Sequence, residues 1–128
     1  MTDPEPATFG LAKIRQIALT VSDLARSIAF YRDALGLRFL FEAPPKMAFF
    51  DCAGVRLMIG EGERPGGSAI VYFAVDDVAR AAAALESRGV VFRVAPALVA
   101  RMPDHELWIG FFDDPDGNAL ALISEVAT

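Results

Sequence analysis

Acid–base chemistry in this sequence would depend on one short stretch. His105 is the only histidine, and Glu106 follows it directly. Because an imidazole titrates near neutrality, His105 is a candidate general base, with Glu106 beside it as a second catalytic group. Asp104, His105, Glu106 and Glu61 could instead act as ligands of a metal ion. The simpler alternative is a histidine that lies in solvent on a loop.

Gln16 and Arg56 are candidates for polar contacts with a small ligand. Arg56 shares one face of a predicted strand with Met58, where its guanidinium could form a bidentate pair with a carboxylate or phosphate. Gln16 lies on the small, partly polar face of the first predicted strand. The structural alternatives are an arginine at a sheet edge in water and an amide that hydrogen-bonds a neighbouring strand. Cys52 is a nucleophile only in principle, because no histidine is near it in the sequence.

Aromatic side chains are concentrated in the predicted strands. Most of them are expected to pack in the core, but a strand that lines a cavity must turn one face towards it. An apolar, aromatic cavity suits a planar or hydrophobic ligand. The aromatic candidates are Phe49, Phe50, Tyr72, Trp108 and Phe112.

Length and composition limit the possible classes of protein. A chain of 128 residues is expected to form one compact domain with a real core. No apolar run approaches the ~18 residues that span a bilayer, and the acidic, Pro-rich start over 1–13 is predicted to be a flexible tail and not a secretory signal. The single cysteine favours the cytoplasm. A net charge of −5 without a Lys/Arg cluster argues against a nucleic-acid partner.

The elements that must position these residues come as a repeat. Residues 48–59 read AFFDCAGVRLMI, and residues 110–123 read GFFDDPDGNALALI. A second matching pair is VSDLAR at 21–26 and VDDVAR at 75–80. The chain is therefore predicted to be a duplication of one module.

Each module is predicted to be a βαβββ unit, and together they form one α+β domain over 14–128. Module 1 covers 14–60, a polar linker covers 61–67 and module 2 covers 68–126. Two such units can curl into a cup-like mixed sheet with the helices outside, and a pocket would form in the concavity.

Two local predictions bear on the candidate site. Asp114-Pro115-Asp116-Gly117 is a strong turn sequence between two strands, with Gly117 at the position that needs a positive φ. Residues 95–106, which contain Pro96 and His105, are predicted to be a long loop.

The whole pattern resembles the vicinal oxygen chelate superfamily, which includes glyoxalase I, bleomycin-resistance proteins and extradiol dioxygenases. The resemblance covers residues 14–126, and it is carried by QIALTVSDLARSIAFYRDALGL, IVYFAVDDVARA and FFDDPDGNALALI. The stretch DHELWIGFFDDPDGNALALISEV also resembles a subgroup of small bacterial members. The resemblance implies the glyoxalase/bleomycin-resistance fold and a homodimer, whereas chemistry must be argued from the site.

In the metal-using members of that superfamily, four inward positions hold a divalent ion. By resemblance, the usual histidine of the opening strand is Gln16 here, which some glyoxalase I enzymes also have. The usual histidine of the second module is Ile70, and the usual glutamate after the turn is Ala121. The fourth position is Met58 by internal repeat, or Leu57 if the strand shifts by one. Such a set does not suit a hard cation, so neither a metal nor another cofactor is expected.

Two functions remain open from the sequence. The first is metal-independent binding of a small, apolar or aromatic molecule in the cup, where the residues expected to line the site are Gln16, Arg56, Met58, Ile70, Tyr72, Trp108, Phe112 and Ala121. The second is a glyoxalase-like lyase or isomerase, or a dioxygenase. It would need a relocated metal site of Gln16, His105 and Glu106, or acid–base chemistry through His105.

Overall fold

The computed structural model describes residues 11–67 and 69–128, which form two βαβββ modules. The α+β class and the tandem repeat predicted from the sequence are confirmed. The predicted tail over 1–13 lies mostly outside the described residues, as does residue 68, the predicted start of module 2. Within the described ranges, no helix is both long and apolar enough to cross a membrane.

The two modules have the same connectivity. Module 1 contains β1 (Gln16–Val21), α1 (Leu24–Ile28), the π-helical turn η1 (Ala29–Ala34), β2 (Arg38–Ala43), β3 (Met47–Cys52) and β4 (Val55–Glu61). Module 2 contains β5 (Ile70–Ala74), α2 (Val78–Glu86), β6 (Phe92–Arg101), β7 (His105–Asp113) and β8 (Ala119–Ala127). The sheet orders are β1-β4-β3-β2 and β5-β8-β7-β6, and the first strand of each module runs parallel to the last.

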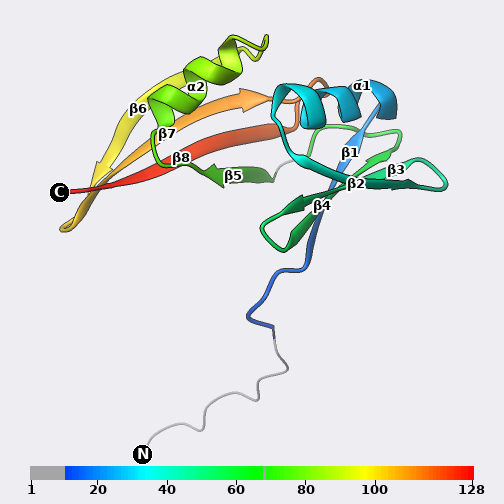
Figure 1. The fold of residues 1–128 in the computed structure, drawn as a ribbon, viewed down its shortest axis with the longest axis horizontal. Coiled ribbons are helices and arrows are strands. Elements are labelled where there is room, and N and C mark those ends of the chain that lie inside the picture. The colour runs from blue at the N-terminus through cyan, green and yellow to red at the C-terminus, as the bar shows by residue number, and fades with distance from the viewer. Residues whose placement is uncertain (1–10, 68) are drawn as a thin grey trace, which may run out of the picture.

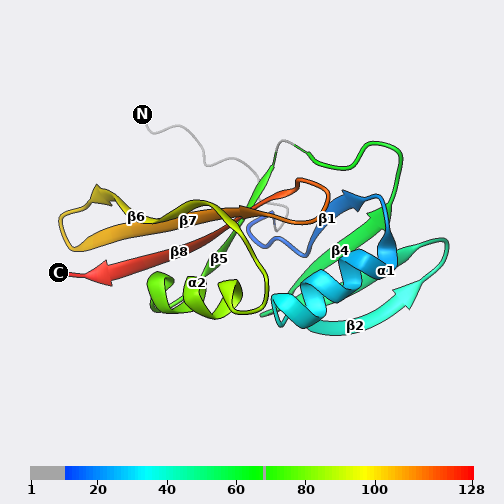
Figure 2. The ribbon, with the colours of Figure 1, turned by 90° about the horizontal axis from the view of Figure 1, so that it is seen from above.

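Figure 1 shows the modules side by side, with α1 and α2 next to each other and the two sheets extending in opposite directions. The view from above agrees: both helices cover the same side of the molecule, and the other side of each sheet carries no helix (Figure 2). We call this uncovered side the open face of each module.

Both helices begin at an aspartate cap and end before a glycine. The carboxylates of Asp23 and Asp77 cap α1 and α2 by accepting from the backbone amides three residues later, at 3.0 and 3.1 Å. Gly36 and Gly89 follow the helices with positive φ values of 76° and 90°. Gly36 lies thirteen residues after Asp23, the cap of α1, whereas Gly89 lies twelve residues after Asp77, the cap of α2. The extra residue in module 1 is accommodated by the π-helical turn η1.

Alternation along the strands separates a core face from the open face. Leu19 and Val21 of β1 are buried beneath α1, whereas Gln16 and Ala18 are exposed on the open face. In module 2, Phe112 and Leu120 lie on the core face, and both are completely buried. The core therefore lies between the sheets and the helices.

The predicted loop over 95–106 is wrong. Strand β6 continues to Arg101, and His105 already begins β7 after a short turn. Pro96 is tolerated because β6 is an edge strand whose pairing shifts register between Val94 and Ala97. A proline is compatible with a sheet at such an irregular edge position.

The turn of module 2 docks against α1 of module 1. The predicted turn is confirmed, since Gly117 has φ 83° and its amide donates to the carbonyl of Asp114 at 3.0 Å. The buried Asp114 carboxylate accepts from the backbone amides of Asp116 and Asn118, at 2.9 and 2.8 Å. It also accepts from the Asn118 side chain and the Tyr31 hydroxyl, both at 2.8 Å. Four hydrogen bonds thus hold one buried charge at the junction of the modules.

Candidate functional site

The open face of module 1 presents an aromatic and sulfur-rich surface that includes the cation of Arg56. Gln16 lies opposite Arg56 in the β1–β4 pair, and its Nε2 is 4.0 Å from the sulfur of Met58. The guanidinium of Arg56 lies 5.7 Å from the ring centroid of Phe49. Phe49 stacks in turn on Phe41 at 4.8 Å, and Phe41 is 45% exposed.

Arg56 has an unusual environment for an arginine on a sheet. Its Nε is buried and has no hydrogen-bond partner among the described residues. The ring of Phe49 stabilises the cation by a cation–π interaction, but it supplies no hydrogen-bond acceptor. The group is therefore oriented by its neighbours and still able to bind an anionic acceptor at its outer nitrogens.

The open face of module 2 is apolar. Ile70 and Tyr72 of β5 are 42% and 46% exposed, and Tyr72 pairs with Ala121 across β5 and β8. Phe111 pairs with Ala121 on the other side, and its ring meets that of Tyr72 edge to face at 6.1 Å. Phe111 is an open-face aromatic residue that the sequence analysis missed, and the pairing register is what identifies it.

Each open face carries two of the four positions that, by resemblance, hold the metal ion in metal-using superfamily members. Gln16 and Met58 lie diagonally across β1 and β4, and Ile70 and Ala121 lie diagonally across β5 and β8. One carboxamide, one thioether and two aliphatic side chains do not fit a catalytic divalent cation, which needs about three N, O or S ligands. Among the described residues, no cluster of three or more His, Cys, Asp or Glu side chains has the geometry of a metal site.

The structure separates His105 from Glu106. They are consecutive residues of β7, so their side chains lie on opposite faces of the sheet. Nδ1 of His105 is 2.6 Å from a carboxylate oxygen of Asp104, and this hydrogen bond holds the pKa of Asp104 below its usual value. Glu106 instead contacts Arg101 at 3.4 Å on the helix-covered side.

The strand alternation also removes three aromatic candidates from the open faces. Phe112 is completely buried in the core and packs on Phe92 with ring centroids 5.1 Å apart. Trp108 lies on the same side as Phe112, where it packs against the core beside α2. Phe50 is also fully buried. Of the eight residues expected to line the site, six are placed on open faces by the strand register: Gln16, Arg56, Met58, Ile70, Tyr72 and Ala121.

Cys52 does not have the surroundings of a reactive thiol. It ends β3 and is half-buried, and burial together with the neighbouring Asp51 raises the pKa of the thiol. A thiol with a raised pKa is a poorer nucleophile near neutral pH.

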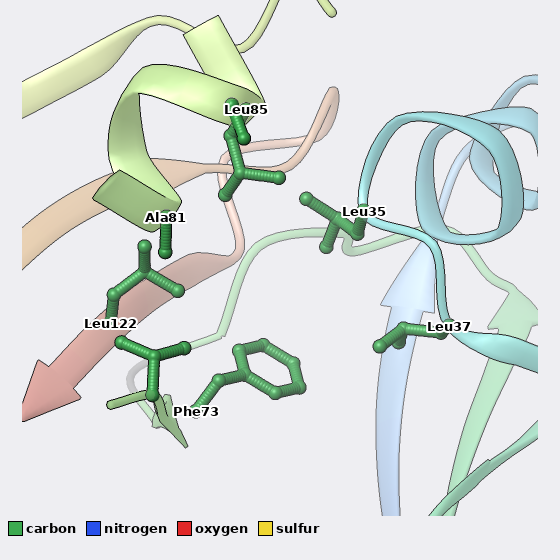
Figure 3. Close-up of a pocket in the computed structure, with 8 residues that line it drawn as sticks. Leu35, Leu37, Phe73, Ala81, Leu85 and Leu122 are labelled. Atoms are coloured by element: carbon green, nitrogen blue, oxygen red, sulfur yellow. The ribbon is translucent and has the colours of Figure 1, made fainter. Parts of the chain in front are cut away.

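A cleft that the sequence did not predict lies between the modules (Figure 3). It measures about 290 Å³, and its lining is apolar. Leu35 and Leu37 of module 1 face Phe73, Leu85 and Leu122 of module 2. Leu35 becomes a wall of this cleft only through the packing of the two modules.

Comparisons with known proteins support the same fold. A structure from Sphaerobacter thermophilus, described as a member of the glyoxalase/bleomycin resistance protein/dioxygenase superfamily, is 25% identical with a TM-score of 0.73 and covers 90% of this chain and 98% of its own. A lactoylglutathione lyase from Agrobacterium tumefaciens is 23% identical with a TM-score of 0.71, covering 90% and 95%. An integron cassette protein from a Halifax Harbour sewage metagenome is 22% identical with a TM-score of 0.76, covering 89% and 99%.

Among curated proteins, no match was found. The sequence profile of one family matches residues 13–122, which is most of the chain and includes both modules. The chain belongs to the Glyoxalase/Bleomycin resistance protein/Dioxygenase superfamily.

Proposed function

We propose that this protein binds a small, aromatic molecule on its open faces without a divalent metal ion. The observation that carries the proposal is the composition of these faces. Phe41, Ile70 and Tyr72 are each more than two-fifths exposed, on sheets whose other side carries the helices and the core. Large apolar groups exposed together are typical of a binding surface.

A second copy of the chain is the proposed partner that closes the site. Each module carries two of the four positions that correspond to metal ligands in the superfamily. The two pairs lie in separate sheets, which extend in opposite directions (Figure 1). In a symmetric dimer, the open face of module 1 in one copy would cover the open face of module 2 in the other. The site would then be lined by Gln16, Arg56 and Phe49 from one subunit and by Tyr72 and Phe111 from the other.

The charge at the site favours a ligand with an acidic group. The guanidinium of Arg56 is the cation held over the ring of Phe49, and its Nε has no acceptor among the described residues. A carboxylate or sulfonate would accept from the outer nitrogens of the guanidinium, and an attached aromatic ring would contact Tyr72 and Phe111. We therefore propose an aromatic organic acid as the ligand class.

One observation favours a second candidate, acid–base catalysis through His105. The hydrogen bond to Asp104 orients the imidazole, as an orienting carboxylate does in many enzymes. The separation of His105 from Glu106 argues against a shared acid–base or metal site of these two residues. The variant His105→Ala tests the candidate: a turnover that survives in it would exclude a catalytic role.

The binding proposal is tested with anilinonaphthalene sulfonate, an aromatic sulfonate that becomes fluorescent in apolar sites. Titration with and without EDTA should give the same saturable binding, and sedimentation should show a dimer. Tyr72→Ala should weaken binding, whereas Ala84→Asp, at the mouth of the cleft between the modules, should not. Binding that is lost in Ala84→Asp and kept in Tyr72→Ala would place the ligand in that cleft and contradict the proposal.

A further inference from the structure

A cleft of about 400 Å³ opens at the N-terminus of α2, on the helix-covered side of module 2. We call it the α2 cleft. It is bounded by the first turn of α2 and by the ends of β7 and β8. The residues used below are Asp76, Asp77, Val78, Glu106, Trp108, Ser124 and Val126. This cleft lies on the opposite side of the sheet from the open face, so it is separate from the site proposed above.

Ser124 is the residue of the α2 cleft that most needs an explanation. Its side chain is only 3% exposed, and its Oγ has no hydrogen-bond partner among the described residues. A buried hydroxyl without a partner costs free energy that a bound group would recover. Such an atom in the wall of a cleft points to an occupant with polar groups.

The internal repeat shows what this position does in the other module. Glu61 pairs with Val21 in module 1, and Ser124 follows Ile123, the partner of Ala74, at the same place in module 2. The Glu61 carboxylate accepts from the first amide of α1, that of Leu24, at 2.9 Å. In module 2 the shorter Ser124 forms no such bond to Val78.

The neighbouring strand differs in the same way. The backbone of Lys46 hydrogen-bonds Glu61, and its ammonium lies 3.5 Å from the Glu61 carboxylate. The residue paired with Ser124 is Trp108. A carboxylate and an ammonium that module 1 places beside the start of α1 are thus replaced in module 2 by a hydroxyl and an indole.

The α2 cleft contains groups that favour a bound anion and groups that favour a bound cation. Asp77 caps the amide of Arg80 at the N-terminus of α2, and the amides of the first turn that remain, together with the partial positive charge of the helix, favour a carboxylate. Asp76, Asp77 and Glu106 line the same wall and favour an ammonium, and the indole of Trp108 can stabilise one by a cation–π interaction. Glu106 is the least free of the three, because it pairs with Arg101 and accepts from Nε1 of Trp108, both at 3.4 Å. An anion alone would meet the acidic side chains and a cation alone would meet the helix terminus, whereas a zwitterion matches both.

We propose that the α2 cleft binds a free amino acid with an apolar side chain. Its carboxylate accepts from the amide of Val78 and the hydroxyl of Ser124, in place of the carboxylate that Glu61 supplies in module 1. Its ammonium donates to Glu106 and Asp76. Its side chain packs on Trp108 and on Val126, which is 43% exposed in the cleft.

The test uses L-leucine, with N-acetyl-L-leucine and L-leucinamide as analogues that lack one of the two charges. Because Trp108 is the only tryptophan, its fluorescence reports on this cleft alone, and calorimetry provides a second readout. L-Leucine should bind saturably, and both analogues should bind at least about tenfold more weakly, since each loses charge-assisted hydrogen bonds. The amide resonance of Val78 should shift with the same saturation curve.

Two variants of one position make the test specific. Ser124→Ala should weaken L-leucine binding about tenfold, and Ser124→Glu should abolish it by placing a carboxylate at the first amide of α2, as Glu61 does for α1 in module 1. Ser87→Ala, which removes a hydroxyl at the other end of α2, should leave binding unchanged. The proposal would be overturned if calorimetry showed no saturable binding of L-leucine, if either analogue bound as tightly as L-leucine, or if Ser124→Ala kept full binding.

Discussion

The hydroxyl of Tyr31 lies 2.8 Å from Oδ2 of Asp114, although 83 residues separate them in the chain. Tyr31 is fully buried in η1 of module 1, and Asp114 opens the turn between β7 and β8 of module 2. This hydrogen bond joins the modules inside the core. It therefore fixes how the two open faces are placed relative to each other.

Removing the Tyr31 hydroxyl should destabilise the fold without unfolding it. In Tyr31→Phe, Asp114 keeps its three other hydrogen bonds, so we expect a loss of about 1–2 kcal/mol in the free energy of unfolding. Asp114→Asn replaces the charged acceptor that all four donors share, and it should cost more, on the order of 3 kcal/mol. Urea unfolding measures both, and an equal loss in the two variants would contradict a central role for the carboxylate.

Alkaline pH should weaken the same contact. Burial, and then the nearby Asp114 charge, raises the pKa of Tyr31 well above its usual value of 10.0. The stabilisation is therefore complete below that value, and it is lost as the pH rises, because the unfolded state releases its proton first. Urea unfolding on both sides of pH 10.0 should show wild type losing its advantage over Tyr31→Phe. The other tyrosine, Tyr72, is common to both proteins, so a parallel decline in the two would refute this assignment.

The turn that carries Asp114 depends on a glycine for its backbone shape. Gly117 has φ 83°, and a Cβ built on it would meet open space. Gly117→Ala should therefore cost about 1 kcal/mol from backbone strain alone. Gly67→Ala is the matched control, because its Cβ also meets open space but its φ is not in the left-handed region. Thermal unfolding should separate the two variants, and equal melting temperatures would show that the turn relaxes.

The role proposed for Arg56 makes a prediction about ligand charge. Arg56→Gln should weaken binding of anilinonaphthalene sulfonate about tenfold, since it removes a charge-assisted contact. It should change binding of the uncharged phenylnaphthylamine little. Arg32→Gln is the control, because Arg32 also lies over a phenylalanine ring, Phe39 at 5.9 Å, but on the helix-covered side. Equal losses for the charged and uncharged dyes would mean that Arg56 acts by packing and not by charge.

The sequence predicted the repeat, the turn and the faces of β1 and β5 because these depend on local pattern. It misplaced Trp108 and Phe112 because the face of a strand residue depends on pairing parity. Phe111 pairs with Ala121 on the open face, so its neighbour Phe112 must point into the core. The predicted loop over 95–106 failed for a related reason, since an edge strand can hold Pro96 at a register shift.

The sequence did not predict the α2 cleft, for a different reason. Ser124 is an ordinary strand residue by type, and it becomes informative only when its position is matched to Glu61 in the other module. The cleft between the modules likewise needs their packing, which no local pattern encodes.

Metal content tests the central claim most directly. The untagged protein, purified without chelator and offered Ni, Zn, Mn, Fe and Co in turn, would be analysed by plasma mass spectrometry. Because Gln16, Met58, Ile70 and Ala121 do not form a donor set for a divalent ion, we predict well below one metal per chain in every case. Near-stoichiometric binding of any of these metals would contradict that claim and place an enzyme of the glyoxalase type ahead of a metal-free binding protein.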